Sequence, residues 1–200
     1  MGADLVARCD WARGAGLLPA IVQDAATLRV LMLGYMDPEA LRVTLASGRV
    51  TFWSRSRGRQ WTKGETSGNG LRVVGVDLDC DGDALLVTAR PDGPTCHRGT
   101  TSCFPRAPGD VLAELDALVA TRVRSRPRGS YTTQLLESGV PRIAQKVGEE
   151  GVEVALAGVA GTDAALMGEA ADLLYHLVVL LRSRGMSLGD ALAVLASRAG

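Results

Sequence analysis

The hydrophobic pattern of the chain changes at residues 104–110, FPRAPGD, and this change most constrains the fold. Before it, short apolar and β-branched runs alternate with breaks rich in Gly and Asp, which is typical of strands joined by turns. After it, apolar residues recur three and four positions apart, which indicates helices. Two prolines and a glycine indicate a linker. The sequence therefore predicts two domains: an α+β, mostly β domain over residues 1–105, and an all-α helical bundle over residues 110–200.

Within the first half, the pattern predicts a hairpin of two strands, followed by a helix that is capped by Asp37, begins at Pro38 and ends at Gly48. A long stretch rich in Arg, Ser and Gly, residues 54–70, is expected to be a loop. Strands are predicted at residues 17–24, 28–36, 49–54, 71–79 and 84–90.

In the second half, four helices are predicted. Ser187 and Asp190 resemble a capping box for the last of them. The other three are expected at residues 110–125, from Pro141 to about 158, and from Thr162 or Asp163 to Gly185.

Composition excludes some classes of function. The 200 residues contain 22 Lys and Arg against 22 Asp and Glu, so the basic excess of a nucleic-acid-binding surface is absent. The start of the chain lacks a signal-peptide core, and no apolar run is expected to span a membrane. We therefore expect a cytoplasmic protein with neither nucleic-acid nor membrane partners, whose thiols stay reduced.

Three of the four cysteines and one of the two histidines lie between residues 77 and 103. Cys80, Cys96 and Cys103 can supply three thiolates to zinc and leave a fourth position for water, as in catalytic zinc sites. The alternative is that they are buried cysteines acting as small apolar side chains. Their spacing matches no common zinc-finger template.

The same stretch contains alternating aspartates. In an extended backbone, Asp79, Asp81 and Asp83 would share one face and Cys80 would point to the other. Carboxylate oxygens suit Mg²⁺, so the sequence predicts a magnesium site there. A polar turn without metal is the alternative.

Residues 54–70 have the composition of an anion-binding segment. Basic side chains supply charge, while small residues let backbone amides approach a phosphate. A solvated surface loop is the alternative. The candidate substrate-binding residues are Arg55, Lys63, Ser67, Gly68 and Asn69.

Acidic residues recur at helical spacing in the second half. Glu149, Glu150 and Glu153 lie on one helix, and Glu169 and Asp172 lie on the next, with His176 four residues further on. A Mg²⁺ site between two antiparallel helices explains carboxylates on otherwise apolar helices. Alternatively, Lys146 acts as their counter-charge. Lys146 is also a candidate substrate-binding residue, because the chain has only two lysines among many arginines.

Several segments together resemble known families. GLLPAIVQD, GRVTFWSRSR, WTKGETSGN, DCDGDALLV and GPTCHRG resemble phosphoribosyl-AMP cyclohydrolase, over residues 1 to about 105. SYTTQLLESG, KVGEEGVEV and EAADLLYHLVVLL resemble phosphoribosyl-ATP pyrophosphohydrolase, over about 110 to 200. The chain is thus similar to the bifunctional enzymes of histidine biosynthesis in which the two are fused.

The resemblance implies metal ligands and an assembly. It implies zinc on Cys80 of one subunit with Cys96 and Cys103 of the other, and hence a homodimer. It also implies Mg²⁺ on the three aspartates of residues 79–83. In the second half it implies Mg²⁺ on Glu150, Glu153, Glu169 and Asp172, with Glu149 adjacent.

These implications lead to two expected reactions on small phosphoribosyl nucleotides. In the second domain, Glu149, Glu150 or Glu153 would orient or deprotonate water for Mg²⁺-dependent release of pyrophosphate. In the first, His97 would move a proton during zinc-dependent opening of the adenine ring. The alternative that His97 only packs beside the metal stays open.

The alternative function is a house-cleaning nucleotide pyrophosphatase fused to a zinc-stabilised binding module. A zinc base deaminase is disfavoured because its H-x-E and P-C-x-x-C motifs do not occur.

Overall fold

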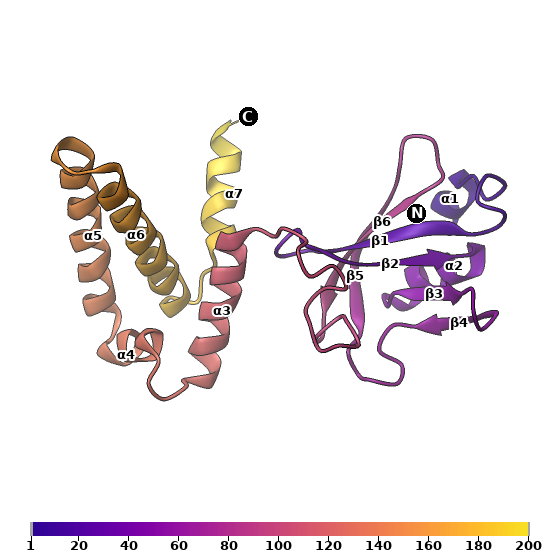
Figure 1. Cartoon of the computed structure of the whole chain (residues 1–200), viewed down its shortest axis with the longest axis horizontal. Helices are drawn as coiled ribbons and strands as arrows, with labels where there is room; N and C mark the ends of the chain where they lie inside the picture. Colours follow the sequence, from indigo (N-terminus) through magenta and orange to yellow (C-terminus); the bar gives the residue numbers. More distant parts are fainter. Residues whose placement is uncertain (1, 200) are drawn as a thin grey trace. The chain divides into compact units, whose positions relative to one another are not determined.

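The computed structural model describes residues 2–199, which form two compact units that divide between Asp110 and Val111 (Figure 1). The first unit is mostly strands, and the second is entirely helical apart from its connections. The predicted fold class, a mostly β α+β domain followed by an all-α bundle, is confirmed.

A four-stranded sheet with strand order β2-β1-β6-β5 forms the centre of the first unit. β1 (Leu18–Asp24) pairs antiparallel with β2 (Val30–Met36) and parallel with β6 (Leu85–Pro91), and β6 pairs antiparallel with β5 (Leu71–Leu78). Alternate residues of β1 are buried, as the period of a strand requires. β1 is thus an interior strand that pairs with the next strand, β2, on one edge and with the distant strand β6 on the other.

α2 (Pro38–Ser47) follows β2 and has the predicted ends. The Asp37 carboxylate accepts a hydrogen bond from the Ala40 N–H at 2.7 Å, and Gly48 ends the helix with a φ of 67°. The stretch expected to be one long loop instead contains β4 (Arg59–Thr62), which pairs with β3 (Thr51–Ser54). That prediction was wrong in part, because the antiparallel pairing to β3 satisfies the backbone of an arginine-rich segment. A short helix that was not expected, α1 (Gly2–Arg8), starts the unit.

The core of this unit places Phe52 against Gly34. Phe52 is fully buried, and a Cβ added to Gly34 would lie 2.3 Å from its ring. Gly34 therefore makes room in β2 for the largest fully buried side chain, and together they hold the β3–β4 pair on the main sheet.

Within residues 111–199, the second unit has five helices: α3 (Val111–Ser125), α4 (Tyr131–Ser138), α5 (Val140–Ala160), α6 (Asp163–Ser183) and α7 (Leu188–Ala199). α4 was not expected. α5 and α6 lie side by side (Figure 1). Val119, Ile143, Val178 and Val179 are buried at the centre of the bundle. Arg182 pairs with Asp116, which links α6 to α3.

By length and composition, α6 qualifies as a candidate membrane span, which the sequence analysis did not expect. Core helices of soluble proteins pass the same test. α6 also contains Glu169, Asp172 and the buried His176, so polar groups interrupt its apolar surface.

Candidate functional site

The three aspartates of the first unit lie on the turn between β5 and β6. The extended geometry considered for them is not observed, because β5 ends at Leu78 and residues 79–83 curl into a turn. One carboxylate oxygen from each of Asp79, Asp81 and Asp83 lies within 4.8 Å of the others. Asp79 accepts hydrogen bonds from the N–H groups of Asp83 and Ala84 at 2.9 and 3.1 Å, and these bonds lower its pKa. The turn itself brings the carboxylates together, and their oxygens fit Mg²⁺.

Arg13 lies against this aspartate turn. Its guanidinium pairs with Asp81 and, at 3.2 Å, with Asp83. The N-terminal segment is anchored there, because the Asp10 N–H donates to the Gly82 carbonyl at 2.7 Å. Gly82 has a φ of 81°, and an added Cβ would approach the Arg8 carbonyl to 3.2 Å. Sequence reasoning missed Arg13, since no local spacing relates it to residues 79–83.

Two of the three predicted zinc ligands lie together. The Cys96 and Cys103 thiols interact, and the pKa of Cys96 is lowered by hydrogen bonds from the Arg98 N–H and the Thr100 hydroxyl. Desolvation raises the pKa of Cys103, as does the neighbouring Cys96. Cys80 is exposed on the aspartate turn, and within residues 2–199 no group of three potential ligands contains a cysteine. A single chain thus offers a thiol pair with the donor chemistry for zinc and a separate third thiol.

A cavity of about 470 Å³ lies beside the thiol pair and brings together several predicted residues. Lys63, Ser67 and His97 all line it. The Lys63 ammonium acts to lower the pKa of Cys103, partly offsetting its desolvation, so the cavity adjoins the thiols. The His97 Nδ1 lies 4.0 Å from the Cys96 Sγ. A cationic, hydroxyl-lined cavity beside two thiols has the chemistry to hold a phosphorylated substrate near a metal.

The other candidates of residues 54–70 lie outside the lining of this cavity. The Arg55 guanidinium lies 3.9 Å from the centre of the Tyr35 ring. Asn69 accepts a hydrogen bond from Lys63 through its backbone carbonyl at 3.3 Å, and Gly68 provides a turn with a φ of 76°. Arg57, one of the basic residues expected to supply charge to this segment, lines the cavity, and so does Trp61, which sequence reasoning did not include. The β3–β4 pairing, which was not predicted, places them there.

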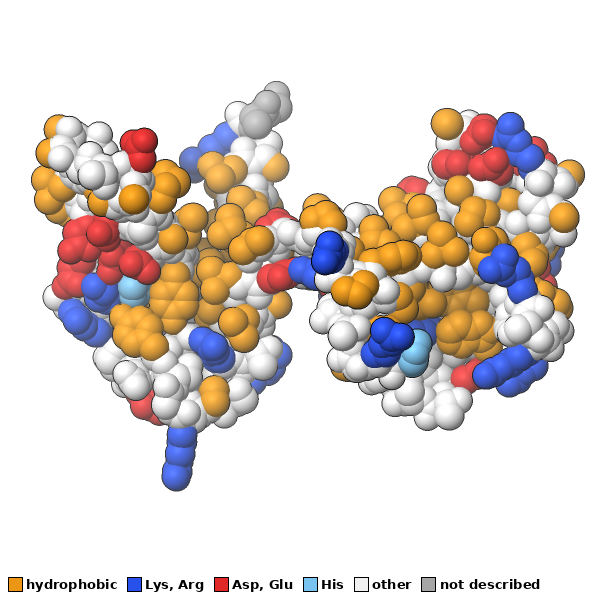
Figure 2. All heavy atoms as spheres, in the orientation of Figure 1, with side chains coloured by type: hydrophobic (Ala, Val, Ile, Leu, Met, Phe, Trp, Pro, Cys, Tyr) orange, Lys and Arg blue, Asp and Glu red, His pale blue; other side chains and the backbone are white. Residues whose placement is uncertain are grey.

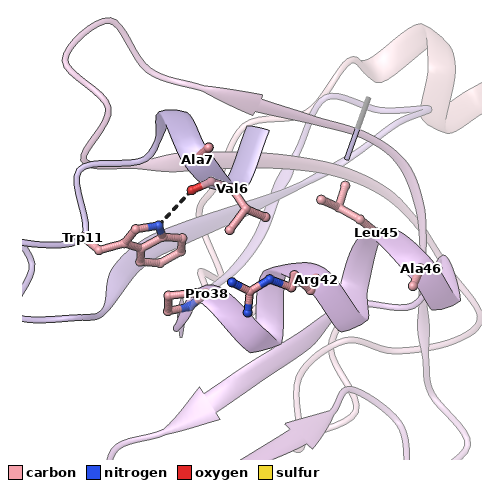
Figure 3. A pocket seen from close by; sticks show the side chains of 7 residues that line it. All are labelled: Val6, Ala7, Trp11, Pro38, Arg42, Leu45 and Ala46. Atoms are coloured by element: carbon pink, nitrogen blue, oxygen red, sulfur yellow. Dashed lines mark hydrogen bonds between the residues drawn. The ribbon is translucent and has the colours of Figure 1, made fainter. Parts of the chain in front are cut away.

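A second cavity, of about 680 Å³, lies between α1 and α2 (Figure 3). Val6, Trp11, Pro38 and Leu45 point toward it, and the Trp11 Nε1 donates to the Val6 carbonyl at 2.9 Å. Its charged lining residue, Arg42, pairs with Glu39 at 2.8 Å. The lining is otherwise apolar, so this cavity contributes no group for proton transfer or metal binding.

In the helical unit, Glu150, Glu169 and Asp172 meet across α5 and α6. One oxygen from each lies within 4.8 Å of the others, and Glu150 is buried. The Lys146 ammonium contacts Glu149 at 2.9 Å and Glu150 at 2.6 Å, which lowers the pKa of both carboxyls. Figure 2 shows acidic side chains gathered on one face of this unit, with basic and histidine side chains at their edge. The predicted pairing of the two acidic helices is thus present, and Lys146 serves as their counter-charge.

Glu149 and Glu153 lie at the edge of this group. Glu149 also pairs with Arg142 at 3.4 Å and accepts from Gln145 at 2.7 Å. Desolvation raises the pKa of Glu153, and so do a hydrogen bond with Glu150 and the charge of Glu169. Glu153 therefore holds a proton more readily than an isolated glutamate. The donor set as a whole is carboxylate oxygen, which fits Mg²⁺.

His176 connects the carboxylates to an aromatic residue. It is buried, and its Nδ1 lies 2.9 Å from the Asp172 carbonyl oxygen and 3.7 Å from a Glu150 carboxylate oxygen. Its Nε2 lies 3.2 Å from the Tyr131 hydroxyl. Sequence reasoning missed Tyr131, because the contact spans α4 and α6 and α4 was not predicted.

Comparisons with known proteins agree with the two-unit organisation. The phosphoribosyl-AMP cyclohydrolase family model matches residues 32–105, and the phosphoribosyl-ATP pyrophosphohydrolase model matches residues 112–199. The histidine biosynthesis bifunctional protein HisIE of Xanthomonas axonopodis pv. citri is 68% identical over 98% of this chain and 95% of its own length. The protein of the same name from Escherichia coli K12 is 54% identical over 94% of this chain and 94% of its own length. The one from Vibrio cholerae is 51% identical over 98% of this chain and 96% of its own length.

Proposed function

Because the chain belongs to the family of bifunctional histidine-biosynthesis enzymes, with cyclohydrolase and pyrophosphohydrolase activities, we propose that each activity uses its own metal site. The single observation that carries the proposal is the presence of two separate donor sets, apart from the aspartate turn. One is a thiol pair beside a cationic cavity in residues 1–105, and the other is a carboxylate group between two helices in residues 110–200.

In the helical domain, Glu150, Glu169 and Asp172 would hold Mg²⁺, which would neutralise the charge of the triphosphate of phosphoribosyl-ATP. Lys146 is poised to exchange its contacts with Glu149 and Glu150 for a phosphate oxygen, since it lies at the same carboxylates. Glu149, Glu150 and Glu153 are the candidates to orient and deprotonate the attacking water. Hydrolysis between the α- and β-phosphates then yields phosphoribosyl-AMP and pyrophosphate.

In the β-rich domain, Cys96 and Cys103, with Cys80 of a second copy, would hold zinc, which supplies an activated water when bound. His97 lies beside Cys96 at the cavity and would carry the proton that ring opening between N1 and C6 of the adenine requires. Lys63 and Ser67 would bind phosphate, with Arg55, Gly68 and Asn69 at the margin. Asp79, Asp81 and Asp83 would bind Mg²⁺, which requires Arg13 to release Asp81.

A homodimer follows from the proposed sharing of zinc ligands. Cys80 is exposed and is not grouped with the thiol pair, as a ligand donated to a second copy must be. The helical domain also exposes apolar side chains at helical spacing, Val152, Leu156 and Val159, which a second copy would cover. We place this dimer in the cytoplasm, where reduced thiols remain available to zinc.

The test supplies phosphoribosyl-ATP and Mg²⁺ to the purified chain and follows pyrophosphate and the ring-opened product separately, before and after removal of zinc. Both products are expected, and only ring opening should stop when zinc is removed. Cys96→Ser should reproduce the loss and lower the zinc content of the protein. Pyrophosphate release that also requires zinc, or ring opening that survives zinc removal, would contradict the proposal.

A further inference from the structure

Three aromatic side chains of the helical unit, Tyr131, Tyr175 and His176, form a compact group beside the carboxylates. The rings of Tyr131 and Tyr175 are stacked, with centroids 6.1 Å apart and planes 22° apart. His176 meets both rings edge to face, at 6.1 and 5.1 Å. Because the other side of the His176 ring faces Glu150, a single imidazole separates the Tyr131 hydroxyl from the carboxylate group.

Hydrogen bonds hold this aromatic group in place. A carbonyl oxygen only accepts, so the His176 Nδ1 donates to the Asp172 carbonyl, and its Nε2 forms a hydrogen bond with the Tyr131 hydroxyl. Behind it, the Tyr175 hydroxyl lies 2.8 Å from the Thr132 hydroxyl, which also accepts from Arg122 at 2.8 Å. Tyr131 therefore has a defined orientation, set by α4, α6 and α3 together.

Despite this support, the Tyr131 side chain is not buried. The residue is 50% exposed, whereas His176 is only 4% exposed. A half-exposed aromatic ring that is held in one orientation loses little conformational entropy when a flat ligand stacks on it. Because Tyr131 lies next to the carboxylates that would bind the triphosphate, we identify the flat ligand with the base of the same substrate.

We propose that the half-exposed ring of Tyr131 binds the adenine ring of phosphoribosyl-ATP by stacking, with His176 as the positioning residue that fixes the phenol. The inference rests on the proposed binding of the triphosphate at Glu150, Glu169 and Asp172. In the substrate, one ribose separates the α-phosphate from the base. In the protein, one imidazole separates the carboxylates from Tyr131, so the phosphate-to-base spacing corresponds to the carboxylate-to-Tyr131 spacing. An adenine substituted at N1 accepts a proton more readily than adenine itself, and a ring with cationic character favours an electron-rich phenol face.

The test compares two inhibitors of pyrophosphate release by the full chain, AMP and inorganic pyrophosphate. AMP has a base to stack, whereas pyrophosphate engages only the metal and carboxylates. Tyr131→Leu is expected to raise the inhibition constant of AMP and the KM of phosphoribosyl-ATP about tenfold, and to leave the inhibition constant of pyrophosphate unchanged. Tyr131→Phe keeps the ring but loses the bond to His176, so the AMP constant should rise at most about threefold.

The matched control is Leu118→Ala, which removes an exposed apolar side chain from α3 in the same unit and should change neither constant. An unchanged AMP constant in Tyr131→Leu would overturn the inference. So would an equal change for both inhibitors, because a merely structural role affects both, or a Phe variant as weak as the Leu variant. Failure of the carboxylate assignment appears differently, as pyrophosphate inhibition that survives Asp172→Asn.

Discussion

The two units bring acidic side chains together by different means. In the helical unit, Lys146, Glu149 and Glu150 obey spacings of three and four residues, and one helix pairing completes the group with Glu169 and Asp172. In the β-rich unit, the carboxylates share one turn, but their cation, Arg13, comes from 68 residues earlier than Asp81. In both units a basic side chain pairs with the acidic group. The difference shows that local helical spacing builds the acidic site of the helical unit, whereas long-range topology completes the one in the β-rich unit.

The largest expected effect tests whether the two sites work independently. Asp172→Asn removes one of the three grouped carboxylates, so pyrophosphate release should fall at least about a hundredfold. Ring opening of phosphoribosyl-AMP supplied directly should remain at the wild-type rate. The two products are measured in separate assays, and a parallel loss of both would show that the sites are coupled and that the comparison fails.

A smaller effect is expected from removing the local counter-charge. In Lys146→Met, four carboxylates repel one another without their cation, so the unfolding temperature of the helical unit should fall by roughly 5 °C in EDTA. Added Mg²⁺ should restore it. Circular dichroism at 222 nm follows this transition. The control is Lys63→Met, the same change at the only other lysine, which should leave the unfolding temperature of the helical unit unaltered. A fall in the unfolding temperature of Lys146→Met that Mg²⁺ does not reverse would contradict the metal site.

Removing the distant counter-charge should act more weakly. Arg13 is exposed and its ion pairs are screened by solvent, so Arg13→Ala should tighten Mg²⁺ binding to the aspartate turn only about threefold. All three tryptophans lie in the first unit, and Trp11 is two residues from Arg13, so tryptophan fluorescence reports on this unit alone. Arg8→Ala is the control. Weaker binding in Arg13→Ala would mean that Arg13 supports the metal instead of competing with it.

The smallest effect concerns a purely local carboxylate in the helical unit. The backbone N–H and hydroxyl of Ser187 donate to Asp190 at 2.7 and 2.8 Å and lower its pKa. A carboxyl whose pKa is lower in the folded state than in the unfolded state stabilises the fold at pH values above its ordinary pKa, about 4. This stabilisation is lost as the pH falls through the pKa of the folded state. Asp190→Asn should therefore lose less stability than the wild type in thermal scans from pH 6 to pH 3. Identical slopes would show that the cap is not formed in solution.

The same contrast explains what the sequence could predict. Helical spacing was enough to group Glu150 with Glu169 and Asp172, because residues on one helical face need only one partner helix. It could not find Arg13 or Tyr131, since each reaches its site through a tertiary contact. The strands and α2 were predicted from apolar runs and caps. β4 was missed because it lies in an arginine-rich segment that lacks a strand pattern, and its pairing with β3 decides its structure.

The position of β1 has a consequence for how the chain folds during synthesis. β1 lies inside the sheet, yet its parallel neighbour β6 is translated about sixty residues later. On the ribosome, the hairpin of β1 and β2 forms first, and the other edge of β1 stays unpaired until Leu85–Pro91 emerges. An open edge of this kind pairs readily with other chains. The nascent β-rich unit is therefore most prone to aggregation during this interval, before the helical unit has emerged from the ribosome.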